Sequence, residues 1–211
     1  MTAHILYRIL RAVSSSLRIL HLAFHNSRDY IFLSASLPQL EELTMEGPHG
    51  YTYLPHHERL PALPKLSKLR VINYSGKVIF EAIADLAPNL THLRLDNIGE
   101  NAGVWVLDCI KSTFDRRSEL LKEENPQGFP SRLQKIYLHP GSTPPQGLCG
   151  NHYMALALTR RSHEHYAELN SDYIYLRLDP YRLKPRRFPD ARWYEWCDRI
   201  NGGNGWWAQL V

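Results

Sequence analysis

The chain has 211 residues, of which 44% are hydrophobic and 22% are charged, as in an ordinary folded protein. Its formal net charge of +4 is too small to indicate nucleic-acid binding by itself. The cysteines (Cys109, Cys149 and Cys197) are odd in number and widely spaced, so we expect free thiols and a cytoplasmic or nuclear protein. No stretch reaches the roughly 18 apolar residues that a membrane span needs, so no membrane partner is expected.

The N-terminal segment allows two interpretations. Residues 1–28 contain arginines and a serine run but no acidic residue, which is the composition of a mitochondrial transit peptide. The interpretation that we favour is a first helix followed by a strand over residues 17–22, because that strand matches later segments of the chain. The helix is expected to bury a stripe of apolar side chains: Ile5, Leu6, Ile9, Leu10 and Val13.

One apolar pattern, Leu-x-x-Leu-x-Leu with Ile, Met or Tyr allowed, recurs along the chain. The copies are Leu17/Leu20/Leu22, Leu40/Leu43/Met45, Leu69/Ile72/Tyr74, Leu90/Leu93/Leu95, Leu133/Ile136/Leu138 and a weaker Tyr173/Leu176/Leu178. Because the last two apolar residues of each copy lie two positions apart, both face the same side of a strand. Parallel stacking of such strands predicts one buried face and one exposed, concave face.

Apolar residues at helical spacing occupy the intervals between these strands, at residues 78–86, 104–121 and 151–169. In the last of these, the stripe consists of Met154, Leu158, His165 and Leu169. The alternation predicts an α/β fold, a leucine-rich-repeat solenoid with parallel strands on the concave side and helices on the convex side. The array is irregular, because its first leucines lie 23, 29, 21 and 43 positions apart and the asparagine usual after the last leucine is mostly missing. Residues 46–66 and 139–151 are expected to be surface loops.

The C-terminal segment is rich in tryptophan. Residues at helical spacing form one stripe that ends at Gly202-Gly203, a pair typical of a helix terminus. We expect residues 190–211 to form a helical cap over the last repeat, within the same domain as the array of residues 1–189. A ligand-stacking site is the alternative for these side chains: Trp193, Trp196, Trp206 and Trp207.

Two repeat segments resemble the repeat region of fungal F-box proteins: Leu37-Pro38-Gln39-Leu40-Glu41-Glu42-Leu43 and Ala87-Pro88-Asn89-Leu90-Thr91-His92-Leu93-Arg94-Leu95. The run Ala191–Gly203 resembles the helix-plus-glycine ending common in that group. The resemblance covers most of the chain and implies the substrate-recognition subunit of a cullin–RING ubiquitin ligase. Because repeat-like sequence begins by Leu17, there is no room for an F-box, and a ligase adaptor is expected as a partner only if an F-box is missing from this chain.

We therefore expect a protein-interaction scaffold whose protein target binds the concave face. The strand pattern assigns these partner-binding residues: Glu42, Thr44, Asn73, His92, Arg94, Asp96, Lys135, Tyr137, Tyr175 and Arg177. The face is expected to pass from acidic residues early in the array to basic residues later, which would orient a partner of mixed charge. The alternative is an ordinary solvated sheet face.

No catalytic motif is present: Gly-x-Ser-x-Gly, a phosphate-binding glycine loop with lysine and His-Glu-x-x-His are all missing from the sequence. His163 and His165 point in different directions on a helix, and Cys149 and His152 lack a second ligand pair, so no metal and no cofactor are expected. We expect no enzymatic activity. The alternatives are an enzyme with a distributed active site, or a nucleic-acid-associated protein that uses the basic runs at residues 160–161 and 184–187.

Overall fold

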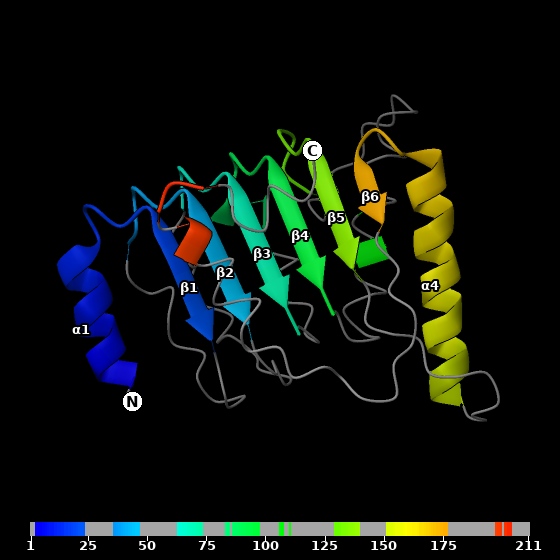
Figure 1. The fold of residues 1–211 in the computed structure, drawn as a ribbon, viewed down its shortest axis with the longest axis horizontal. Helices are drawn as coiled ribbons and strands as arrows, with labels where there is room; N and C mark the ends of the chain where they lie inside the picture. Colours follow the sequence, from blue (N-terminus) through cyan, green and yellow to red (C-terminus); the bar gives the residue numbers. More distant parts are fainter. Residues whose placement is uncertain are drawn as a thin grey trace. The chain divides into compact units, whose positions relative to one another are not determined.

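The computed structural model describes residues 3–23, 36–46, 63–73, 83–84, 86–97, 106–107, 110, 129–139, 151–176, 197–199 and 201–203. The chain divides into two compact units, Met1–Pro180 and Tyr181–Val211. In the first unit, six strands form one sheet in chain order, and every neighbouring pair is parallel (Figure 1). The strands are β1 (Ile19–Ala23), β2 (Glu42–Glu46), β3 (Lys68–Ile72), β4 (His92–Asp96), β5 (Lys135–His139) and β6 (Ile174–Leu176). The predicted α/β class with a parallel sheet is confirmed.

A tight turn precedes each of strands β2 to β5. In each turn a leucine amide donates to the carbonyl three residues earlier, at 3.0 to 3.1 Å, for Leu40, Leu66, Leu90 and Leu133. Pro38, Pro64 and Pro88 occupy the second position of the first three turns, where the fixed φ of proline favours a turn. The local sequence therefore sets the point at which each strand begins.

The leucines of the turn and of the strand share the core side of the sheet. Leu40, Leu43, Leu66, Leu69, Leu90 and Leu93 are all fully buried. Each such side chain contributes about 1.5–3 kcal/mol of burial free energy, so these rows supply much of the stability of the unit.

The third strand differs from its prediction. Its repeat is Leu66/Leu69/Val71, because Val71 pairs with Met45 and Leu95 on the core side, whereas Ile72 lies on the opposite side. The predicted repeat Leu69/Ile72/Tyr74 lies three positions too late in the chain. Because side chains alternate along a strand, a shift by an odd number of residues exchanges its two faces. Leu63 and Leu66 are fully buried, so the end of the predicted surface loop 46–66 belongs to the core.

The sheet is continuous across the longest interval between repeats. Strand β4 pairs directly with β5, with Leu93 opposite Ile136 and Leu95 opposite Leu138. In β6, Ile174 and Leu176 continue these core rows. The weak sixth copy therefore belongs to the sheet. Ile174 occupies a core position, although the predicted pattern Tyr173/Leu176/Leu178 does not include it.

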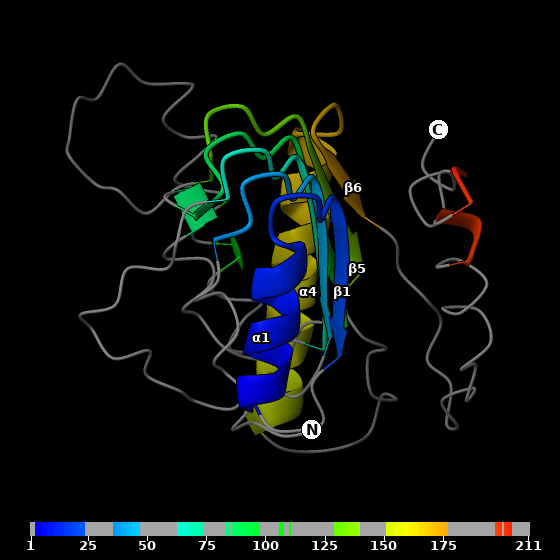
Figure 2. The same cartoon turned by 90° about the vertical axis from the view of Figure 1, so that its left-hand side faces the viewer.

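Two long helices, α1 (Ala3–Val13) and α4 (Asn151–Leu169), lie at opposite ends of the sheet, beside β1 and β6, and on the same side of it (Figures 1 and 2). The bounds of α4 match the predicted helix, but its predicted stripe is wrong, because Leu158, His165 and Leu169 are exposed. The side that packs on the sheet carries His163 and Ala167.

The prediction for α1 is also only partly right. Leu10 is buried in the core, but Ile5, Ile9 and Val13 are exposed, because the end of the sheet covers only one side of this helix. The two predicted middle helices fall mostly outside the described residues. Their described parts are helical and buried, at Ile83, Leu86, Val106, Leu107 and Ile110.

The second unit is described at residues 197–199 and 201–203. The amide of Gly203 donates to the carbonyl of Asp198 and that of Gly202 donates to Arg199, while Gly202 has a φ of 89°. This bonding is the Schellman arrangement that ends a helix. The predicted tryptophan-rich cap lies otherwise outside the described residues.

Two asparagines end strands β3 and β4 in the same way. Asn73 has a φ of 57° and Asn97 a φ of 51°, both left-handed, and Asn97 Nδ2 donates to Asn73 Oδ1. Each lies two positions after the last core residue of its repeat, where leucine-rich repeats commonly have asparagine. Because the third copy was predicted three positions too late, the sequence pattern did not assign this role to Asn73.

We expect Asn97→Ala to lower the free energy of unfolding by about 1–2 kcal/mol, because alanine is strained in the left-handed region. Asn97→Gly should cost less, since glycine adopts that conformation without strain. Urea unfolding of both variants measures the difference. Equal losses would show that the contact with Asn73, and not the backbone conformation, accounts for the effect.

Candidate binding face

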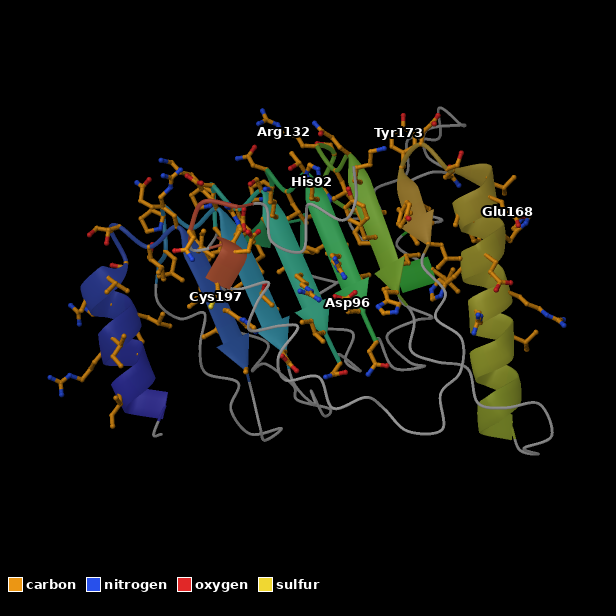
Figure 3. The ribbon with its side chains drawn as sticks, viewed as in Figure 1. His92, Asp96, Arg132, Glu168, Tyr173 and Cys197 are labelled. Carbon is orange, nitrogen blue, oxygen red and sulfur yellow. The ribbon has the colours of Figure 1, made fainter. Side chains whose placement is uncertain are left out.

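The side of the sheet opposite the core carries most of its polar side chains. We call it the polar face, defined by alternate strand positions that the parallel register places in three rows: Ile19, Glu42, Lys68, His92 and Lys135; His21, Thr44, Arg70, Arg94, Tyr137 and Tyr175; and Ala23, Glu46, Ile72, Asp96 and His139. Figure 3 shows two of these side chains, His92 and Asp96, on β4. Neighbouring members of a row stand close enough across the strands to interact.

Exposure is uneven across the polar face. Its centre is buried: the polar side chains Glu42, Thr44, Arg70, Arg94 and Asp96 are each less than a tenth exposed. Toward β5 and β6, Lys135 and Tyr175 are exposed, and Tyr175 is 52% exposed. The predicted exposure of this face therefore applies to its β5–β6 end and is wrong at its centre, where Glu42 pairs with Lys68 and Asp96 pairs with Arg70 and Arg94.

Asp96 is the centre of this buried polar cluster. Its carboxylate accepts from Arg70 Nε at 2.6 Å and from Arg94 Nε at 3.0 Å, and His139 Nδ1 lies at 3.4 Å. Burial alone raises the pKa of Asp96, but the hydrogen bond from His139 and the charges of the two arginines outweigh it and hold this pKa well below its usual range. The carboxylate therefore stays ionised and links strands β3, β4 and β5.

His92 stands between two lysines in the first row. Desolvation lowers its pKa, and the positive charges of Lys68 and Lys135 lower it further. Its Nδ1 lies 2.9 Å from the hydroxyl of Thr91. Lys68 and Lys135 thus place two positive charges beside His92 in this row, of which Lys68 also contacts Glu42, and such charges favour anionic groups.

Aromatic rings follow the basic residues toward β6. The rings of His92 and Tyr137 are stacked at 6.4 Å, and those of Tyr137 and Tyr175 are tilted at 6.0 Å. Burial raises the pKa of the Tyr137 hydroxyl, and the charge of Arg94 opposes this. The two tyrosines thus supply adjacent aromatic rings with hydroxyl groups that donate and accept hydrogen bonds.

Two of the acidic residues of the polar face, Glu42 and Glu46, lie on β2. Glu42 accepts from Lys68 Nζ at 3.2 Å, and Glu46 lies 3.8 Å from His21 Nε2. Basic residues lie on β3 to β5, with Asp96 among them. The passage from acidic to basic residues stays a prediction, because Asp96 interrupts the basic residues and pairs with Arg70 and Arg94.

The structure brings together most of the residues predicted to bind a partner: Glu42, Thr44, His92, Arg94, Asp96, Lys135, Tyr137 and Tyr175 share the polar face. Asn73 does not belong to it, because it ends β3 in a left-handed turn. Arg177 lies outside the described residues.

Two basic residues of the polar face, Lys68 and Arg70, were missed by the sequence pattern. The signal for them was the opening Leu63-Pro64-Lys65-Leu66, which has the same form as Leu37-Pro38-Gln39-Leu40 and places the next strand three residues earlier.

The described part of the chain contains no group of three or more residues suited to hold a metal ion. His163 is 1% exposed and lies on the packed side of α4, not on the polar face. No described helix combines the length and the apolarity that crossing a membrane requires.

Comparisons of the chain with models of protein families, with curated proteins and with solved structures found no match.

Proposed function

We propose that the chain is a protein-interaction scaffold: an irregular leucine-rich-repeat array that binds a protein target on the polar face and catalyses no reaction. One observation carries this proposal. Six strands in chain order place apolar residues on one side and charged, hydroxyl and aromatic residues on the other, in register across the sheet. A flat row of fixed side chains of this kind suits recognition of a large surface.

The target contacts are assigned to the β5–β6 end of the polar face. Lys135 and Tyr175 are exposed there; tyrosine is among the residues that contribute most to protein interfaces, and Lys135 adds a positive charge. Arg94 is excluded from direct contact, because it is buried and paired with Asp96. The positive potential around Lys135 favours a target with acidic groups.

The doubly substituted chain Lys135→Glu/Tyr175→Ala tests this assignment. Both side chains are exposed, but Lys135 Nζ donates to the carbonyl of Asp172 and the ring of Tyr175 lies against that of Tyr137, so the free energy of unfolding should fall by roughly 1 kcal/mol with the fold kept. We expect a protein captured by the native chain from its own cell extract to be lost from the double variant and retained by the control Arg161→Glu, which changes an exposed charge on α4. Retention by the double variant would place the binding surface elsewhere.

The link to ubiquitination rests on the resemblance to fungal F-box proteins alone. If it holds, the protein bound at the polar face is a substrate, and a longer chain with an F-box would also recover adaptor and cullin subunits. Quantitative mass spectrometry of the same captures measures both. The decisive capture uses a chain that includes all upstream coding sequence. If it recovers a target but no ligase subunit, the result would support the scaffold role and contradict the ligase role.

A further inference from the structure

Helix α1 has two apolar sides, and the sheet covers only one of them. Leu10 is 2% exposed and Tyr7 packs against the core. Ile5, Ile9 and Val13 are 49%, 49% and 37% exposed. These three residues are spaced four apart, so they form one line along the helix, about 12 Å long at 1.5 Å per residue.

The core beneath this end of the sheet is also less enclosed than its middle. Leu17 and Leu20 are only partly buried, whereas their equivalents in the next repeat, Leu40 and Leu43, are fully buried. Helix α1 and β1 lie side by side here (Figures 1 and 2). Apolar surface therefore continues from the core to the exposed line on α1, which is the form of an interaction surface rather than of scattered exposed residues.

The charged side chains of α1 itself are all basic. Arg8 and Arg11 are exposed on α1, and residues 1–28 contain no aspartate or glutamate. Arg18 is engaged elsewhere, with its guanidinium 2.8 Å from the carboxylate of Glu41. A partner therefore gains from negative charge beside its apolar residues.

The same charges argue against two other occupants. A second copy of the chain would bring the arginines of two α1 helices together, and like charges oppose that contact. A membrane-surface helix uses a broad apolar face rich in aromatic residues, whereas this line has three aliphatic side chains and the neighbouring side of α1 is held in the core. A line of residues at i, i+4 and i+8 matches instead the ridge that packs into the groove of another helix.

We propose that Ile5, Ile9 and Val13 form a docking site for an amphipathic helix of another protein, with acidic residues flanking its apolar stripe. This site is separate from the polar face, so a protein bound at α1 and a target bound at β5–β6 can occupy the scaffold together. It does not depend on the proposed function.

The test uses the full chain and two designed helical peptides. One has leucines along one side and glutamates on the flanks; the other has lysine in place of each glutamate. In fluorescence anisotropy we expect the acidic peptide to bind about tenfold or more tightly than the basic one. Ile9→Gln should weaken its binding about tenfold, and Arg8→Glu/Arg11→Glu should reverse the preference between the peptides.

Leu158→Gln is the matched control, because Leu158 is an exposed apolar residue on α4, and it should leave binding unchanged. All three positions changed on α1 are exposed, so circular dichroism should show the native fold in each variant. Binding of neither peptide, or equal binding of both, would overturn the proposal. So would flotation with vesicles of phosphatidylserine and phosphatidylcholine, or dimerisation in sedimentation, if either is lost in Ile9→Gln.

Discussion

Asp96→Asn is expected to lower the free energy of unfolding by about 3–5 kcal/mol, the usual cost of removing one partner from a buried ion pair. Asp96 is 5% exposed, and its single negative charge offsets part of the positive charge of two guanidinium groups that are themselves buried. Without its charge, Arg70 and Arg94 repel each other inside the protein. Urea unfolding of the native chain and the variant measures the loss. The control Asp172→Asn makes the same chemical change at an exposed position and should be nearly neutral.

The same residue gives a signed pH dependence. Because the folded state holds the pKa of Asp96 below its unfolded value of about 3.9, its ionisation stabilises the fold above that pH. This contribution is lost as the pH falls below about 5 and toward the folded-state value. Between pH 5 and pH 3, the free energy of unfolding should therefore fall more steeply for the native chain than for Asp96→Asn. The reason is that only the native chain has a carboxylate at this position to titrate. Parallel curves for the two proteins would show that Asp96 is not held ionised by its partners.

Leu69→Ala is expected to lower the free energy of unfolding by about 2–5 kcal/mol, the range for leucine truncation in a packed core. Leu69 is fully buried and stands between Leu43 and Leu93 in the register of the sheet. The shortened side chain leaves a cavity that the two neighbouring strands, fixed by their hydrogen bonds, fill only in part.

The control for this truncation is Leu158→Ala, because Leu158 is 61% exposed on α4 and should change the free energy by less than about 0.5 kcal/mol. Thermal and urea unfolding of both variants give the comparison. A similar cost at the two positions would contradict the buried register of β3.

Much of the sheet follows from local sequence signals. The proline turns before β2 and β4 and the apolar spacing of Leu-x-x-Leu-x-Leu predict where these strands lie and which side they bury. The error at β3 has a physical cause. Leu69, Ile72 and Tyr74 match the pattern as well as Leu66, Leu69 and Val71 do, because apolar residues lie on both sides of this strand.

The faces of the two terminal helices depend on their neighbours. Helix α1 has more apolar surface than the end of the sheet can cover, so composition alone does not tell which side is buried. Helix α4 packs through His163 and Ala167, which are a polar and a small residue, while Leu158 and Leu169 are exposed. Hydrophobic spacing predicts the bounds of this helix correctly but predicts the wrong buried side. Packing against β6 decides which side is buried.

The sequence predicts which side chains share the candidate site, but not which of them are paired with one another. Strand alternation places Lys135, Tyr137 and Tyr175 on one face from sequence alone. The Asp96 cluster depends on Arg70 of the neighbouring strand and His139 of the next, so it emerges only when the register of three strands is known. Within that cluster Arg94 is buried and paired with Asp96, which strand alternation alone does not predict.

Site-specific photo-crosslinking tests the proposed binding face most directly. A full chain that carries benzoylphenylalanine in place of Tyr175 should, on irradiation in its own cell extract, form an adduct with a protein target. The same group in place of Glu168, which is exposed on α4, should not (Figure 3). An adduct from position 168 with none from position 175 would contradict the assignment of the target to the polar face.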